Sequence, residues 1–178
     1  LVRSLPSKLL AAILIPTVAT FAGFSLLCHV AARRALEAEL GRRLCAVAAA
    51  AAAQISSEAV GLLSAGDEST RTHRNLLRRL TELQRATQVA RIYVFAKDQS
   101  LRVDTGGTPI GERGYGLASA ASELRRVFHG EQAASLLFRG RDGALYKSGY
   151  APILDAEEGG GGGPPRFAVG ADAGASFY

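Results

Sequence analysis

The sequence predicts an α+β chain: a transmembrane helix continues into a long helix, and a five-stranded antiparallel sheet covered by helices follows. Two observations carry this prediction. The run Leu9–Ala32 contains no Asp, Glu, Lys or Arg, and ten of the twelve aromatic residues lie beyond residue 90. We therefore divide the chain into a tail at 1–8, a transmembrane helix at 9–32, a long outgoing helix with a second helix at 33–90, and the sheet at 91–178.

The uncharged run Leu9–Ala32 is long enough to cross a bilayer. At 1.5 Å per residue it makes a helix of roughly 36 Å, against a hydrocarbon core of about 30 Å. Pro16 is expected to kink this helix, which membrane helices tolerate. Two alternatives are a cleaved signal peptide, which has a shorter apolar region, and the core helix of a globular protein. An uncleaved signal anchor, with the lipid bilayer as partner, fits the length best.

Residues 33 to about 64 are predicted to continue as one helix. Apolar residues recur there at intervals of three and four: Leu36, Leu40, Leu44, Val47, Ala51, Ile55, Ala59 and Leu62. Such a stripe must be covered, so we expect it to pack on the chain's own domain and on a second copy in a homodimer.

A second helix is expected from about Thr70 to Gln88. Gly66–Thr70 breaks the first helical pattern and offers cap residues, and Leu76 and Leu80 mark the apolar side. The arginines on its other side form either a solvated basic face or a surface for lipid headgroups.

Beyond Thr87 the pattern changes from helix to short strands separated by turns. The predicted strands are 91–96, 101–105, 133–139, 144–153 and 166–173. A glycine-rich loop fills 106–117, and a short helix opens at Ser119 and stops at Gly130. The dipeptide Asp142-Gly143 indicates a hairpin. Helices are expected on one face of this sheet.

Several classes of function are excluded by what the sequence lacks. The net charge of +5 is small and dispersed, without an aromatic-basic surface, so no nucleic acid partner is expected. His29, His73 and His129 lack the spacing of metal ligands. The sequence has no nucleophile elbow, P-loop or dinucleotide fingerprint. We therefore expect no metal, no cofactor and no catalytic residue in this chain.

A binding pocket remains possible on the sheet. Alternation along 144–151 places Tyr146, Ser148 and Tyr150 on one face and Lys147 on the other. The tyrosines are either core and rim residues or the wall of a cleft. In the second case the loop at 106–117 would close over a small polar ligand.

The opening SLPSKLLAAILIPTVATFAGFSLLCHVAARRALEAELGRRL resembles the first membrane helix and outgoing helix of bacterial sensor histidine kinases. The segments RIYVFAKDQSLRVDT, ASELRRVFHGEQAASLLFRGRDGALYKSGYAPI and RFAVGADA resemble a single Cache domain, the PAS-like extracytoplasmic sensor fold. The resemblance implies a dimer through the long helix, strand order 2-1-5-4-3, and a ligand between the sheet and the loop before the third strand. It makes the following residues ligand-binding candidates: Tyr93, Asp104, Arg113, Tyr115, Tyr146, Lys147, Ser148 and Tyr150.

The function that this resemblance implies is signal input. The chain would be the sensor region of a receptor in the bacterial inner membrane, most simply a fragment of a two-component histidine kinase, with its sensor outside the cell membrane. The family's HAMP linker and kinase core have no counterpart in the sequence, so the chain itself is not expected to be an enzyme. Chemoreceptors and cyclases carry similar input modules. A structural or protein-interaction module is the rival hypothesis.

The distribution of positive charge opposes this orientation. Four arginines follow the span, at 33, 34, 42 and 43, whereas only Arg3 and Lys8 precede it. The positive-inside rule then favours a cytoplasmic sheet. We keep the orientation of the family, with a cytoplasmic N-terminus.

Overall fold

A computed structural model describes residues 5–140, 142–154 and 163–175 of the chain. Its elements fall into two compact units, Leu1–Glu39 and Leu40–Tyr178, which are described separately. Helix α1, Leu5–Ala52, begins in the first unit. The segment Ala12–Ala52 is long and apolar enough to cross a membrane, by length and composition, with a mean hydropathy of 1.8 in its apolar window.

Helix α1 continues through Pro16. Thr20 Oγ1 donates a hydrogen bond of 2.7 Å to the Pro16 carbonyl, and Thr17 Oγ1 donates one of 2.8 Å to the Ile13 carbonyl. Both hydroxyls are thereby satisfied by the backbone of their own helix.

The prediction of one helix from 33 to about 64 was wrong. Helix α1 ends at Ala52 and a separate short helix, α2, spans Ser57–Gly61. The last turn tightens, since Gln54 N donates to Ala51 O and Ile55 N to Ala52 O. Ser56 is then extended, with φ −83° and ψ 131°. Serines compete with the helix for backbone hydrogen bonds, and the break still leaves the Ile55 side chain in the core.

The second helix has the expected bounds. A 3₁₀ turn, η1 at Asp67–Ser69, precedes helix α3, Arg71–Thr87. The Thr70 side chain caps α3 by accepting a hydrogen bond from His73 N. Gln88, with φ 56°, turns the chain out of the helix.

The sheet has the expected antiparallel order. Strands β1 (Arg91–Ala96), β2 (Leu101–Asp104), β5 (Leu145–Pro152) and β6 (Phe167–Gly174) form its body. The order is β2-β1-β6-β5-β3, with β4 paired to β5, and every pair is antiparallel. This confirms the order that the resemblance implied.

The third predicted strand, 133–139, is split in two. It consists of β3 (Ala133–Ala134) and β4 (Phe138–Arg139). Between them a side chain enters the ladder, because Ser148 N donates to Ser135 Oγ at 2.9 Å. Leu136, which follows, is 80% exposed. Alternation of residue types does not reveal such an interruption.

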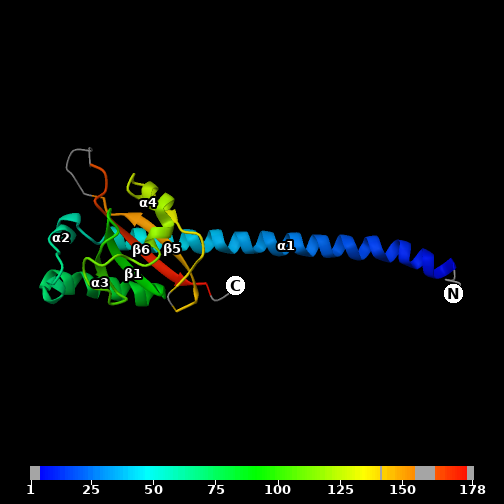
Figure 1. Cartoon of the computed structure of the whole chain (residues 1–178), viewed down its shortest axis with the longest axis horizontal. Helices are drawn as coiled ribbons and strands as arrows, with labels where there is room; N and C mark the ends of the chain where they lie inside the picture. The colour runs from blue at the N-terminus through cyan, green and yellow to red at the C-terminus, as the bar shows by residue number, and fades with distance from the viewer. Residues whose placement is uncertain (1–4, 141, 155–162, 176–178) are drawn as a thin grey trace. The chain divides into compact units, whose positions relative to one another are not determined.

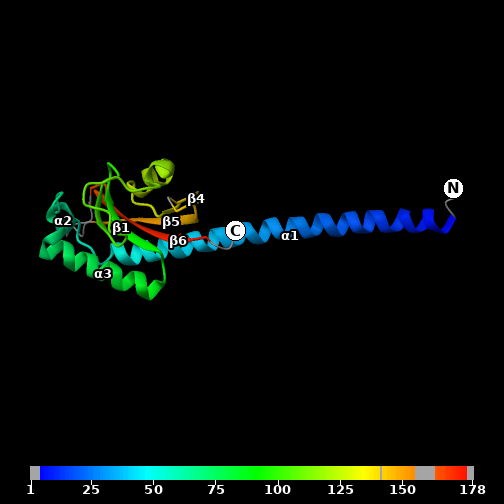
Figure 2. The same cartoon turned by 60° about the horizontal axis from the view of Figure 1, so that its bottom comes forward.

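Helices cover both faces of the sheet, not one as predicted (Figures 1 and 2). On one face Ile92, Val94 and Val169 share a core with buried residues of α1 and α3. On the other face η2 (Leu117–Ala120) and α4 (Ala121–Val127) cover Phe95 and its neighbours. This second face carries the candidate site.

Strand β5 and helix α1 touch through their backbones. A Cβ atom on Gly149 would lie 2.3 Å from the Leu44 carbonyl carbon and 2.4 Å from Cys45 N. Only glycine permits this approach. Gly149 lies between Ser148 and Tyr150, which face the opposite side of the sheet. Strand β5 therefore contacts α1 with one face and borders the candidate site with the other.

Candidate ligand-binding site

A cavity of about 340 Å³ lies between the sheet and the loop at 106–117, at the position that the resemblance implied. Its wall comes from the start of β1, the end of β6, the glycine-rich loop and the β4–β5 hairpin. The residues used below line it: Arg91, Thr108, Arg113, Tyr115, Phe138, Asp142, Tyr146 and Asp172.

Asp172 is the buried acid of this cavity, with 6% of its surface exposed. In the sheet register it pairs with Arg91 on β1 and Ser148 on β5, so the three side chains share one row and one face. Ser148 Oγ donates to Asp172 Oδ1 at 2.6 Å and Tyr93 OH donates to the same oxygen at 3.1 Å. In the described part of the chain no other side chain hydrogen-bonds Asp172, and no cation forms a salt bridge with it.

Gly170 makes the hydrogen bond from Tyr93 possible. A Cβ atom on Gly170 would lie 2.5 Å from Tyr93 Cζ, so the tyrosine ring needs the space that glycine leaves. The ring crosses β6 at that point, and its hydroxyl reaches Asp172 two residues further on.

Burial raises the pKa of Asp172 to about 6, although the Ser148 hydrogen bond, the Arg91 charge and the Tyr93 hydroxyl all act in the opposite direction. Burial also raises the pKa of Tyr93 well above its ordinary value, and the negative charge of Asp172 adds to this. The base of the cavity thus holds a carboxylate that feels the charge of Arg91 but forms no salt bridge within the described part of the chain.

The nearby guanidinium of Arg91 is held by another acid. Its Nε and Nη2 donate to the two carboxylate oxygens of Asp104 at 2.7 and 2.8 Å, and Nη2 also donates to Thr108 Oγ1 at 3.1 Å. Asp104 accepts two further bonds, from Gly106 N at 2.8 Å and Thr108 N at 2.9 Å. Burial raises the pKa of Asp104, but the hydrogen bonds outweigh it and hold the pKa below the ordinary 3.8. Arg91 and Asp104 therefore neutralise each other.

Aromatic rings and one cation form the mouth of the cavity. Tyr146 OH donates to Asp142 Oδ2 at 2.7 Å, and the Tyr146 and Phe138 ring centroids are 6.2 Å apart. Tyr115 is 42% exposed and donates to the Arg139 carbonyl at 3.1 Å. The exposed Arg113 side chain forms no hydrogen bond or ion pair with a residue that the structure describes. The cavity thus combines an acidic base with an aromatic mouth that carries one cation, Arg113, and one acid, Asp142, whose pKa is lowered by hydrogen bonds.

The fold of this chain is similar to that of several solved structures. No protein-family model matches the chain, and no curated protein matches it. The solved sensor domain of Escherichia coli DcuS is similar over 79% of this chain and 92% of its own, with 16% identity and a TM-score of 0.54. The sensory domain of the Campylobacter jejuni chemoreceptor Tlp3, solved with isoleucine bound, is similar over 90% of this chain, with 8% identity and a TM-score of 0.56. The chain spans 62% of that Tlp3 chain.

The fold is that of a Cache-type sensor domain. The long N-terminal helix and the antiparallel sheet covered by helices agree with these neighbours. The fold class that the sequence predicted is confirmed.

The predicted site residues occupy three kinds of position in this fold. Arg113, Tyr115 and Tyr146 line the cavity itself. Tyr93 and Ser148 lie beneath it and hold Asp172. Asp104 does not line the cavity but forms an ion pair with Arg91, which does.

Two predicted residues lie away from the cavity. Tyr150 is 1% exposed and packs edge-on against Phe95, with ring centroids 5.9 Å apart. Lys147 lies on the opposite face of the sheet, where its Cε would be 3.1 Å from a Cβ placed on Gly41 of α1. The alternation along β5 had already indicated this face for Lys147.

The residues that the sequence did not indicate are Arg91, Asp142 and above all Asp172. Asp142 was assigned only to the hairpin. A signal for Asp172 was present, because it is the one charge inside the otherwise apolar strand FAVGADAG. Its meaning depends on which residues face it across two neighbouring strands, and that register is not visible in the sequence alone.

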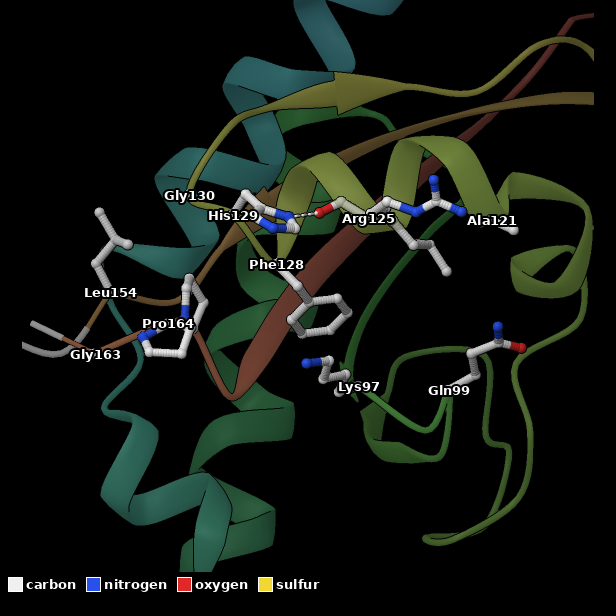
Figure 3. Close-up of a pocket in the computed structure, with 12 residues that line it drawn as sticks. Lys97, Gln99, Ala121, Arg125, Phe128, His129, Gly130, Leu154, Gly163 and Pro164 are labelled. Carbon is white, nitrogen blue, oxygen red and sulfur yellow. Dashed lines mark hydrogen bonds between the residues drawn. The ribbon is translucent and has the colours of Figure 1, made fainter.

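A larger cavity of about 780 Å³ lies beside α4. Figure 3 shows Phe128 pointing into it, with His129 Nδ1 2.6 Å from the Arg125 carbonyl. Its basic residues, Lys97, Arg125 and His129, are all exposed. Charges that water already solvates give a ligand little to satisfy, so we do not assign this cavity a ligand.

No group of three or more His, Cys, Asp or Glu side chains able to hold a metal ion occurs among residues 5–140, 142–154 and 163–175.

Proposed function

We propose that the chain is the sensor input region of a membrane-bound bacterial receptor. Its sensor domain binds a small polar ligand outside the cell membrane, in the cavity above Asp172, and the ligand carries an ammonium group. The observation that carries this proposal is the buried carboxylate of Asp172, which lines the cavity without a cationic partner among the described residues.

The chemistry of the cavity favours a primary amine over a simple carboxylate. A buried anion is costly unless a cation pairs with it, and Arg91 is already bound to Asp104. An ammonium group entering the cavity would supply that cation. The rings of Tyr115, Phe138 and Tyr146 would shield it from water and add cation–π attraction.

The mouth of the cavity adds a second specificity. Arg113 offers a guanidinium to a carboxylate carried by the same ligand. A molecule with an ammonium at one end and a carboxylate at the other, such as an amino acid, would satisfy both groups. The chemoreceptor Tlp3, which shares the fold, has been solved with isoleucine and with L-valine.

We further propose that the signal leaves the domain through strand β5. Ser148 hydrogen-bonds Asp172 on the ligand face, and the next residue, Gly149, lies against Leu44 and Cys45 of α1. A ligand that favours one position of β5 would thereby favour one position of α1. This is a population shift, and it requires different ligand affinities in the two states.

The remaining parts of the proposal concern assembly and location. The exposed face of α1 in the sensor unit carries Ala46 and Ala50, whose small side chains permit close packing of a second copy, and Arg42 one turn before them. We propose a homodimer through this face, with the apolar part of α1 in the inner membrane and the sheet outside. The parent protein would be a two-component sensor histidine kinase, with a chemoreceptor or a cyclase as the alternative.

The test is calorimetry on the full chain in lipid nanodiscs at pH 7.5. L-Valine is compared with isobutylamine, which lacks the carboxylate, and isovalerate, which lacks the amine; the common amino acids follow as a panel. We expect L-valine and isobutylamine to bind, and isovalerate not to bind. Asp172→Asn should weaken amine binding at least tenfold, whereas Asp98→Asn, an exposed aspartate away from the cavity, should not. Equal binding of carboxylates without an amine would contradict the proposal.

The rival function, a protein-interaction module without a ligand, predicts different results. The substitutions Tyr146→Ala and Arg113→Ala remove two side chains from the cavity mouth. In a sensor they abolish ligand response while the chain stays folded and dimeric. If no member of the panel binds and these variants behave as the parent does in every assay, the interaction module is the better description.

A further inference from the structure

The Asp172 carboxylate can pair either with a proton or with the ammonium group of a ligand. Both hydrogen bonds that it accepts from described residues, from Ser148 and Tyr93, end on Oδ1. A hydroxyl can donate to a carboxylate and, more weakly, to the carbonyl oxygen of a carboxylic acid. These two bonds therefore survive when Asp172 is protonated, and the change is confined to the other oxygen, Oδ2.

The charges around Asp172 are balanced. Arg91 on β1 attracts it and Asp104 on β2 repels it, but these two are joined as an ion pair at 2.7 Å. On β5, the hydroxyls of Ser148, Tyr146 and Tyr150 interact with the Asp172 carboxylate by hydrogen bonding or through its charge. The hairpin and the loop contribute one hydrogen-bonded acid, Asp142, and one exposed cation, Arg113, to the lining of the same cavity. None of these forms a salt bridge with Asp172 in the described part of the chain.

Burial then decides the protonation of this carboxyl. Its pKa rises to about 6, so the group changes charge within the pH range of natural environments. Its position at the base of the cavity means that this change occurs where the ligand's ammonium would bind.

We propose that a proton and the ammonium of the ligand compete for Asp172, so that mild acid empties the ligand site. This inference rests on the proposed function and adds a regulation to it. The receptor reads two variables at one carboxylate: amine concentration and acidity. No covalent step is involved, since a proton is simply exchanged with water.

The quantitative expectation follows from competition. Above about pH 6 the affinity for an amine is constant, and below it the apparent Kd rises tenfold for each pH unit. Bound amine in turn lowers the pH at which Asp172 takes up a proton.

The experiment is a carbon-13 NMR titration of the full chain in detergent micelles, with labelled aspartate carboxyls, between pH 3 and 8. One signal should titrate near pH 6 without ligand. It should disappear in Asp172→Asn and move to higher pH in Ser148→Ala, which removes a hydrogen bond that stabilises the charged form. Asp98→Asn is the control, because it should remove a signal that titrates below the ordinary 3.8. The Ser148→Ala shift identifies the signal even if Asp172→Asn fails to fold.

The titration is then repeated with saturating L-valine and with isobutylamine. A midpoint that falls by one pH unit or more with either probe supports the competition. A midpoint near 6 that neither probe moves overturns it. A signal that titrates near 4 also overturns it, and in that case pH-independent amine binding in calorimetry would leave the proposed function intact. Absence of amine binding at every pH would instead remove the proposed function.

Discussion

Two aspartates on one face of the sheet, Asp104 and Asp172, have pKa values shifted in opposite directions. The pKa of Asp104 is lowered because hydrogen bonds and Arg91 outweigh its burial, whereas burial raises the pKa of Asp172 to about 6. Each is almost fully buried, with 4% and 6% exposure. The difference is the cation, which one carboxylate has and the other lacks.

This difference predicts how the stability of the unliganded chain depends on pH. Folded Asp172 holds its proton up to about pH 6, whereas the unfolded chain releases it near 3.8, so stability rises as pH falls between these values. The stabilisation from Asp104 is present above 3.8 and is lost as pH falls below it. We expect maximal stability between pH 4 and 6, measured by urea denaturation with circular dichroism. A steady loss of stability from pH 8 to pH 4 would contradict this.

The variant Asp172→Asn should remove the rise in stability that the parent chain shows as pH falls from about 6 to 3.8. The change in pKa from 3.8 to about 6 corresponds to about 3 kcal/mol, so the variant should gain up to that amount at pH 7.5 and lose the rise below pH 7. The same denaturation series measures it, with Asp98→Asn as the control that should keep the rise between pH 6 and 3.8, because the pKa of Asp98 lies below that window.

Loss of Arg91 should have the opposite effect. Arg91→Gln leaves the Asp104 carboxylate buried and unpaired, which is expected to cost about 3 kcal/mol. Arg91→Lys keeps the charge but loses the two-pronged hydrogen bond, so it should cost less. The double variant Arg91→Gln with Asp104→Asn should recover part of the loss. A similar stability of Arg91→Gln and the parent chain would show that the pair is not structural.

Among the contacts between elements, the one between α1 and β5 is expected to tolerate an added side-chain atom least. Gly149→Ala would place a Cβ 2.3 Å from the Leu44 backbone, so α1 or β5 must move, at an expected cost of about 3 kcal/mol or more. Gly41→Ala meets only the Ala134 and Lys147 side chains, at 3.0 and 3.1 Å, and should cost about 1 kcal/mol. Gly174→Ala, on β6 with open space around it, is the control. Thermal unfolding should rank the three in that order.

Most elements could be predicted from the sequence, because periodicity is local. The spans of α3, β1, β5 and β6 agree with apolar repeats and turn residues in the chain. The end of α1 and the split of 133–139 could not be predicted in this way. They depend on a tightened helical turn at Ala52 and on the Ser135 hydroxyl that replaces a ladder bond.

For the whole molecule, the fold was predictable and the centre of the site was not. The strand order came from the resemblance to Cache domains, since residue spacing does not determine which strands pair. Two of the predicted candidates on the loop, Arg113 and Tyr115, line the cavity. Asp172 was missed because its importance arises only when β1, β5 and β6 align it with Arg91 and Ser148.

Assembly gives a further prediction at this scale. If the exposed face of α1 packs on a second copy, Ala46→Cys in a chain with Cys28→Ser and Cys45→Ala should form a disulfide-linked dimer under mild oxidation. Ala48→Cys in the same background should not, because Ala48 is fully buried in its own domain. Non-reducing electrophoresis distinguishes the two. Equal cross-linking of both variants would argue against a defined interface.

The ion pair between Arg91 and Asp104 has one more consequence. By occupying the nearest cation, it prevents the empty domain from satisfying Asp172 internally. The empty domain is therefore kept at a higher free energy than one in which Asp172 had a salt bridge, and under the proposed function a bound ammonium group would lower it. Such an arrangement lowers the stability of the empty domain. It also widens the free-energy difference between the empty and the occupied states beyond what the ligand's other contacts would provide. Under the proposed function, such a site would distinguish the empty from the occupied state without any additional contact to its ligand.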